Sequence, residues 1–190
     1  MKYAKMLGLL AIAVAASMAL VGTASATITS PPGTVYNGHF EMTSTNTELD
    51  GTVDIKCKHV IITGDIVNGS TTAAVTTLDF KECGPDTYLT TRGGYLRLDS
   101  NGTAYLEDAE FTVLMHRTVF GFPVTTHCEY FTQVSPGTDI GTLTEGVSPP
   151  QVHLIGINLA KTPTDSACGE NSQWTGTFTF TTPATAIVVH

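Results

Sequence analysis

The chain has 190 residues, and its 17 acidic side chains outnumber nine basic ones, for a formal net charge of −8 at pH 7. Nucleic acids and anionic lipid surfaces repel a chain of this charge, so the composition argues against both as partners. A domain of about 150 residues buries roughly 68–70% of its unfolded surface, so the chain is long enough for a substantial core.

Residues 1–26 have the three parts of a secretory signal peptide. Lys2 and Lys5 give a positive start, an apolar run follows, and the tripeptide ASA at 24–26 has the small-x-small form that signal peptidase accepts. We therefore predict that residues 1–26 are removed on export and that residues 27–190 form one mature domain without a transmembrane segment. Loss of both lysines leaves seven basic and 17 acidic residues. The predicted location is secreted, either extracellular or in the cell envelope.

The mature chain alternates short runs rich in Val, Ile, Thr, Tyr and Phe with turn residues. HVIITGDIV, AVTTLDF and WTGTFTF are typical runs, and Pro-Pro-Gly, Asn-Gly and Ser-Pro-Gly sequences separate them. No stretch after residue 26 has the 3.6-residue period of a helix. The pattern predicts an all-β fold, a single antiparallel β-sandwich of Ig-like or jelly-roll-like type.

An even number of cysteines in an exported chain predicts disulfides. The mature part contains four of them: Cys57, Cys83, Cys128 and Cys168. They predict two disulfides, and three pairings are open. In GTVDIKC, Val53, Ile55 and Cys57 share one strand face while Asp54 and Lys56 take the other, so Cys57 is predicted to point inward.

The segment DSNGTAYLEDAE, residues 99–110, has side-chain oxygens at the spacing of a twelve-residue calcium loop. Its candidate ligands are Asp99, Asn101, Thr103, Glu107 and Glu110. Two features argue against bound calcium: Ala104 stands where the loop needs glycine, and the flanking residues predict strands. We expect a hairpin around Asn-Gly without an ion, with Leu96 facing Leu106.

Further along, LMHRTVFGFPVTTHCE (114–129) predicts a second hairpin. If Gly121-Phe122 form its turn, Met115 faces Cys128 on the core side and His116 faces His127 on the solvent side.

Two opposed imidazoles with Glu129 beside them are reasonable ligands for zinc or copper. His116, His127 and Glu129 are therefore a candidate metal site. The alternative, an ordinary solvated strand face, is favoured because a functional site needs a third ligand and supporting outer groups. No cofactor is predicted.

The sequence contains no G-x-S-x-G, H-E-x-x-H or P-loop motif, and we nominate no catalytic residue. Trp174, the only tryptophan, is predicted to pack in the core against a disulfide.

The order of several segments is similar to that of one group of proteins. SPPGTVYNG, DIKC, TLDFKEC, HCEY, IGTLTEG and CGENSQWTGTFTFTTP resemble, in this order, uncharacterised β-rich secreted proteins of high-GC Gram-positive bacteria. The resemblance covers nearly the whole mature chain. It implies a two-disulfide β-sandwich with cysteines paired in sequence order, Cys57 with Cys83 and Cys128 with Cys168. It implies no activity and no ligand.

Two classes of function remain open. The first is an exported extracellular or cell-envelope protein, non-enzymatic, with a binding or structural role and an unknown partner, for which the cell wall or a surface is a candidate. The second is a secreted hydrolase with a dispersed carboxylate or histidine site. The missing motifs favour the first.

Overall fold

The protein is built from strands. The computed structural model describes residues 26–50, 54–84, 86–134, 136–161, 168 and 171–190; the predicted signal peptide, apart from Ala26, lies outside these residues, as does Val53. The described residues contain no helix, so the all-β prediction is confirmed. The strands are β1 (Ile28–Thr29), β2 (Gly38–Ser44), β3 (Thr47–Asp50), β4 (Ile55–Cys57), β5 (His59–Ile66), β6 (Thr72–Lys81), β7 (Thr87–Arg92), β8 (Tyr95–Leu98), β9 (Thr103–Glu107), β10 (Glu110–Val119), β11 (Phe122–Phe131), β12 (Thr138–Thr144), β13 (Gln151–Lys161), β14 (Asn171–Thr182) and β15 (Val188–Val189).

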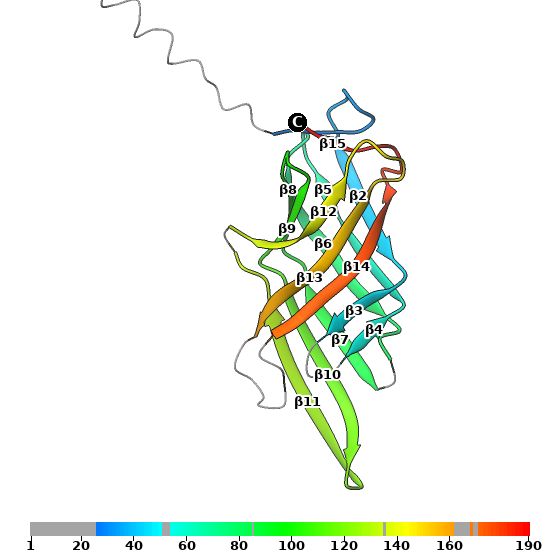
Figure 1. The fold of residues 1–190 in the computed structure, drawn as a ribbon, viewed down its shortest axis with the longest axis vertical. Coiled ribbons are helices and arrows are strands. Elements are labelled where there is room, and N and C mark those ends of the chain that lie inside the picture. The colour runs from blue at the N-terminus through cyan, green and yellow to red at the C-terminus, as the bar shows by residue number, and fades with distance from the viewer. Residues whose placement is uncertain (1–25, 51–53, 85, 135, 162–167, 169–170) are drawn as a thin grey trace, which may run out of the picture.

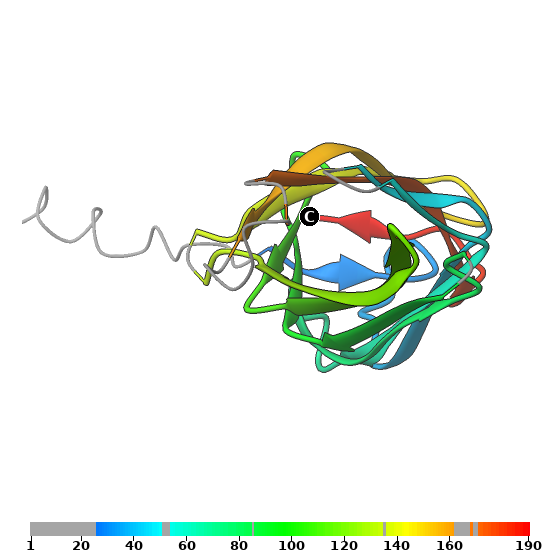
Figure 2. The same ribbon diagram turned by 90° about the horizontal axis from the view of Figure 1, so that it is seen from below.

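Eight strands close into a barrel. Antiparallel pairs run in the order β14-β2-β5-β6-β8-β9-β12-β13, and β13 pairs with β14 to complete the ring. Figure 2 shows this ring from below. The predicted sandwich of two sheets is therefore replaced by a closed barrel with extra strands. Alternation of inward and outward residues is the same in both architectures, so the sequence pattern did not distinguish them.

Bulges help the sheet to curve. The pairing shifts register in several places, among them between Asp139 and Gly141, where β12 meets β9. Gly141 has a φ of 144°, and a Cβ there would lie 1.8 Å from the carbonyl oxygen of His153. Only glycine fits this close approach of β12 to β13.

Two branches extend the ring at one end. β13 and β14, with 11 and 12 residues, are long enough to continue past their partners β12 and β2. In the first branch, β14 pairs with β3, and β3 pairs with β4. In the second branch, β13 pairs with β11, β11 pairs with β10, and β10 pairs with β7.

The interior is filled by side chains, as expected for a barrel of eight strands. Trp174, on the part of β14 that pairs with β3, is fully buried, and its ring lies 5.4–5.7 Å from those of Phe80, Phe111 and Phe178. The prediction that Trp174 is a core residue is confirmed, with aromatic rings as its neighbours.

Both disulfides are formed in sequence order, Cys57 to Cys83 and Cys128 to Cys168. Cys57 and Ile55 are buried while Asp54 and Lys56 are exposed, which confirms the inward direction predicted for Cys57.

The two ends of the described chain meet. β1 pairs with β15, and the backbones of Thr27 and His190 exchange hydrogen bonds of 2.9 and 3.0 Å. Figure 1 places this two-stranded sheet at one end of the barrel and the turn of the β10–β11 hairpin at the other. None of the described residues forms a helix long and apolar enough to cross a membrane.

Candidate functional site

The β10–β11 hairpin projects from the barrel (Figure 1). Among the described strands, β7 borders β10 only as far as Met115, and β13 borders β11 only at Tyr130 and Phe131. Residues 116–125 are exposed on both strands. The His116 amide still donates to the Asp86 carbonyl at 2.9 Å, and beyond it the hairpin continues as an unflanked two-stranded arm.

The turn of this arm lies one residue earlier than predicted. Val119 pairs with Phe122, and Phe120 and Gly121 form the turn with φ values of 52° and 85°. A two-residue turn with positive φ at both positions is of type I′, in which glycine suits the second position. The sequence prediction had placed Gly121 first. The correction moves the register by two residues, so each side chain keeps the face predicted for it.

The predicted pairing of His116 with His127 is therefore wrong, although both lie on the solvent side. His116 is opposite Thr125, and its Nδ1 is 3.0 Å from the Thr125 hydroxyl. His127 is opposite Leu114, and its Nε2 lies 3.5 Å from a carboxylate oxygen of Glu129.

The two imidazoles thus have separate partners. Within the part of the chain that the structure describes, no three His, Cys, Asp or Glu side chains are grouped to hold a metal ion.

The tip of the arm is apolar. Phe120 is 97% exposed and Phe122 is 72% exposed, while Val119 and Val124 are each 38% exposed. Val119, Phe122 and Val124 lie on the same face as the buried Met115, with Arg117 between Met115 and Val119 on that face. The core face of the hairpin thus continues into solvent beyond the barrel, with one cation on it. Contiguous exposed apolar groups of this kind mark interaction surfaces.

Phe120 is also an unusual residue for its position in the turn. The first position of a type I′ turn favours Asn, Asp or Gly, and a bulky L-residue at positive φ is an outlier. Its nearly complete exposure gives the ring no packing role in the fold. Local rules broken without a structural gain are typical of functional positions.

The arm carries little charge. Residues 111–128 contain no Asp, Glu or Lys, and Arg117 is their only arginine. Its guanidinium donates to the Thr126 hydroxyl at 3.2 Å. The arm is thus weakly basic in an acidic protein.

The calcium-like segment forms the predicted hairpin. Leu96 pairs with Leu106, and the Asp99 and Thr103 backbones are hydrogen-bonded across the turn. The carboxylates are committed to arginines: Arg97 pairs with Asp99 and, at 3.2 Å, with Glu107.

Glu110 and Asn101, two of the three remaining candidate ligands, are also engaged. Glu110 lies 3.0 Å from Arg92, and the Asn101 side-chain oxygen accepts the Thr103 amide at 2.9 Å. Arg97 further stacks on Tyr105, 4.0 Å from the ring centroid. The positive charge beside Asp99 and Glu107 is thus the guanidinium of Arg97.

We therefore expect the melting temperature to be the same in excess calcium and in a chelator. Arg97 already neutralises the two carboxylates that a calcium ion would need. Thermal unfolding followed by circular dichroism tests this. A rise of several degrees in calcium that Asp99→Ala abolishes would contradict it.

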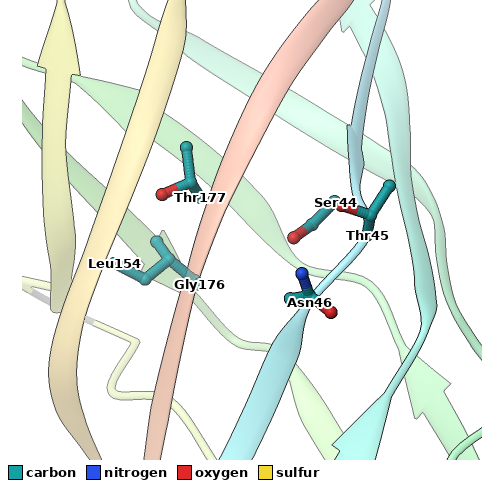
Figure 3. Close-up of a pocket in the computed structure, with 6 residues that line it drawn as sticks. All are labelled: Ser44, Thr45, Asn46, Leu154, Gly176 and Thr177. Atoms are coloured by element: carbon teal, nitrogen blue, oxygen red, sulfur yellow. The ribbon is translucent and has the colours of Figure 1, made fainter.

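A shallow hollow of about 350 Å³ lies where the β2–β3 turn approaches β13 and β14 (Figure 3). It is lined by Ser44, Thr45, Asn46, Leu154, Gly176 and Thr177. Its polar groups are hydroxyls, one amide and backbone, none of which titrates near neutral pH. They can hydrogen-bond a ligand but supply no acid or base. This hollow was not predictable from the sequence, because its residues come from three separate segments.

A second hollow, of about 240 Å³, lies at the root of the arm and is lined in part by Tyr130, Glu129 and Glu110. Burial raises the pKa of Tyr130 above its usual value of 10.0. The unfolded chain loses this phenolic proton above about pH 10, whereas the folded chain retains it.

We expect the free energy of unfolding to fall as pH rises from 10 toward the raised pKa of Tyr130, and Tyr130→Phe to reduce that fall. Urea unfolding at several alkaline pH values measures both. An equal alkaline loss in the wild type and the variant would rule out this contribution of Tyr130.

Comparisons with protein-family models, with curated proteins and with solved structures found no match.

Proposed function

We propose that this is an exported, non-enzymatic protein of the extracellular space or cell envelope, which binds a partner surface through the tip of the β10–β11 arm. The observation that carries this proposal is the exposure of Phe120 and Phe122 at the end of an unflanked hairpin. The signal-peptide pattern supports export, and the two disulfides are compatible with an oxidising compartment.

The rest of the molecule holds the root of this arm in place. The Cys128–Cys168 disulfide fixes β11 at the root of the arm, and Val113, opposite Cys128, is buried in the core. Rigid aromatic side chains on a fixed hairpin lose little conformational freedom on binding. We also propose that the protein belongs with the secreted two-disulfide proteins that its cysteine and glycine landmarks resemble.

A hydrolase is the weaker proposal. The carboxylates of residues 99–110 that the sequence singled out are paired with arginines, and the hollow in Figure 3 is lined by neutral groups. The hollow at the root of the arm is lined by Glu110 and Glu129, which are paired with Arg92 and His127. General acid–base chemistry needs a titratable group positioned beside the substrate.

The test is a pair of substitutions that improve the turn and remove the aromatic rings. Phe120→Asn with Phe122→Thr creates the Asn-Gly sequence favoured in type I′ turns and keeps a residue suited to strands. We expect a melting temperature equal to or above that of the wild type, with a lower fraction of protein retained on producing cells. Immunoblots of cell-surface and medium fractions measure retention.

Ile155→Thr is the matched control, because Ile155 is 75% exposed on β13, away from the tip. It should be retained like the wild type. The same distribution for all three proteins would contradict a binding role for the tip.

A further inference from the structure

We propose that the partner of the arm is a lipid bilayer with neutral or zwitterionic head groups, into whose interfacial region the tip inserts. This inference rests on the proposed function of the tip as a binding surface. It names the chemistry of the partner.

The shape of the tip suits a bilayer. Phe120 and Phe122 form a convex end, and a protein partner would need a matching concave pocket, whereas a bilayer deforms around an inserted group. Amphipathic elements bury their apolar groups about 5–10 Å into the interface. The five residues from His116 to Phe120 span about 17 Å at about 3.4 Å per residue, so the tip reaches this depth while the barrel stays in water.

The backbone of the tip also leaves few hydrogen-bonding groups unpaired. This suits an apolar medium, where each unpaired amide or carbonyl costs free energy. A two-residue turn leaves few such groups, because Val119 and Phe122 bond directly across it. Thr118 and Pro123 form the next pair. In an antiparallel ladder the backbone nitrogens of this pair point away from the opposite strand. Pro123 has no N–H, so the outer edge of β11 has one exposed donor fewer just behind the tip.

The same proline argues against another protein strand as the occupant. Addition of a strand to β11 would use the outward amides, and proline removes one of them. On the β11 side of the tip, recognition is therefore left to side chains, whereas Thr118 keeps an outward N–H on the β10 side.

The low charge of the arm is compatible with a membrane interface. The acid-free segment 111–128 keeps carboxylates away from the acyl region. Polar side chains begin one pair below Val119 and Phe122. Arg117 lies opposite Val124, Thr118 opposite Pro123 and His116 opposite Thr125, at the level where phosphate and carbonyl groups of lipids would lie. The acidic remainder of the protein disfavours strongly anionic membranes, which is why we specify neutral or zwitterionic lipids.

The test uses the exported protein, with both disulfides intact, and vesicles of phosphatidylcholine. Flotation measures the fraction bound for the wild type, for Phe120→Asn with Phe122→Thr, and for Ile155→Thr. Transfer of one phenylalanine ring from water contributes about tenfold or more to partitioning, so the double variant should bind about a hundredfold more weakly. Ile155→Thr should bind like the wild type, and added salt should leave wild-type binding unchanged.

A spectroscopic measurement reports insertion itself. Phe122→Trp in a Trp174→Phe background places the single tryptophan at the tip. Its emission should shift to shorter wavelength on addition of vesicles and should be quenched by brominated acyl chains. An emission that stays unchanged in bound protein would overturn insertion.

The remaining outcomes separate this inference from the proposed function. If cell retention depends on the tip but the wild type does not float with phosphatidylcholine, the partner is a protein or a wall polymer and the lipid inference is wrong. If neither retention nor flotation depends on the tip, both proposals fail. Binding only to anionic phosphatidylglycerol vesicles, reversed by salt, would show electrostatic adsorption in place of insertion and would also overturn the inference.

Discussion

Replacing both Cys128 and Cys168 by serine should lower the free energy of unfolding by about 4 kcal/mol, since the bridge joins residues 40 apart and constrains the unfolded chain. The same change at Cys57 and Cys83, 26 residues apart, should cost about 3.5 kcal/mol. Cysteines are replaced in pairs so that no free thiol remains to form a wrong disulfide.

Urea unfolding at neutral pH without reductant measures both losses. The wild type in reductant should approach the stability of a variant that lacks all four cysteines. A loss below about 1 kcal/mol for either pair would mean that the bridge adds little to the barrel, contrary to this expectation.

Trp174→Ala should destabilise the protein by about 3–5 kcal/mol, the cost of emptying a large buried site. The vacated space would lie among three phenylalanine rings on separate strands, which limits its collapse. Trp174→Phe should cost much less, about 1–2 kcal/mol, although it also removes volume. The reason is that a phenyl ring fills most of the space of the indole. In addition, the buried indole N–H has no hydrogen-bond partner among the described residues, so its removal breaks no hydrogen bond.

The comparison of the two Trp174 variants is made by urea denaturation with circular dichroism as the signal, because the variants lack the tryptophan fluorophore. Equal losses for Trp174→Phe and Trp174→Ala would show that a phenyl ring restores none of the packing at this position and would contradict the expectation.

Strand faces were predictable from the sequence, whereas closure of the sheet was not. The alternation in IKC and in LMHRTV depends on neighbours in the chain, and it gave the correct inward direction for Cys57, Met115 and Cys128. Closure depends on the pairing of β13 with β14 and on bulges such as that at Gly141, which no local period encodes.

The candidate site was predicted in part. The hairpin and its polar face were correct, but its register required the type of turn, and Phe120 is an unusual residue at the first position of a type I′ turn. The exposed tip could not be foreseen, because Val119, Phe122 and Val124 read as an ordinary core strand. Only the early end of the neighbouring strands leaves them in solvent.

The closed ring also has a consequence for the order of folding. Thr43 in β2 pairs with Thr179 in β14, so one seam of the barrel joins segments from opposite ends of the chain. Contacts between such distant segments slow folding, because a long stretch of chain must be ordered before they form. A chain that completes its barrel late stays open for longer after synthesis, which agrees with the proposed export across a membrane before folding.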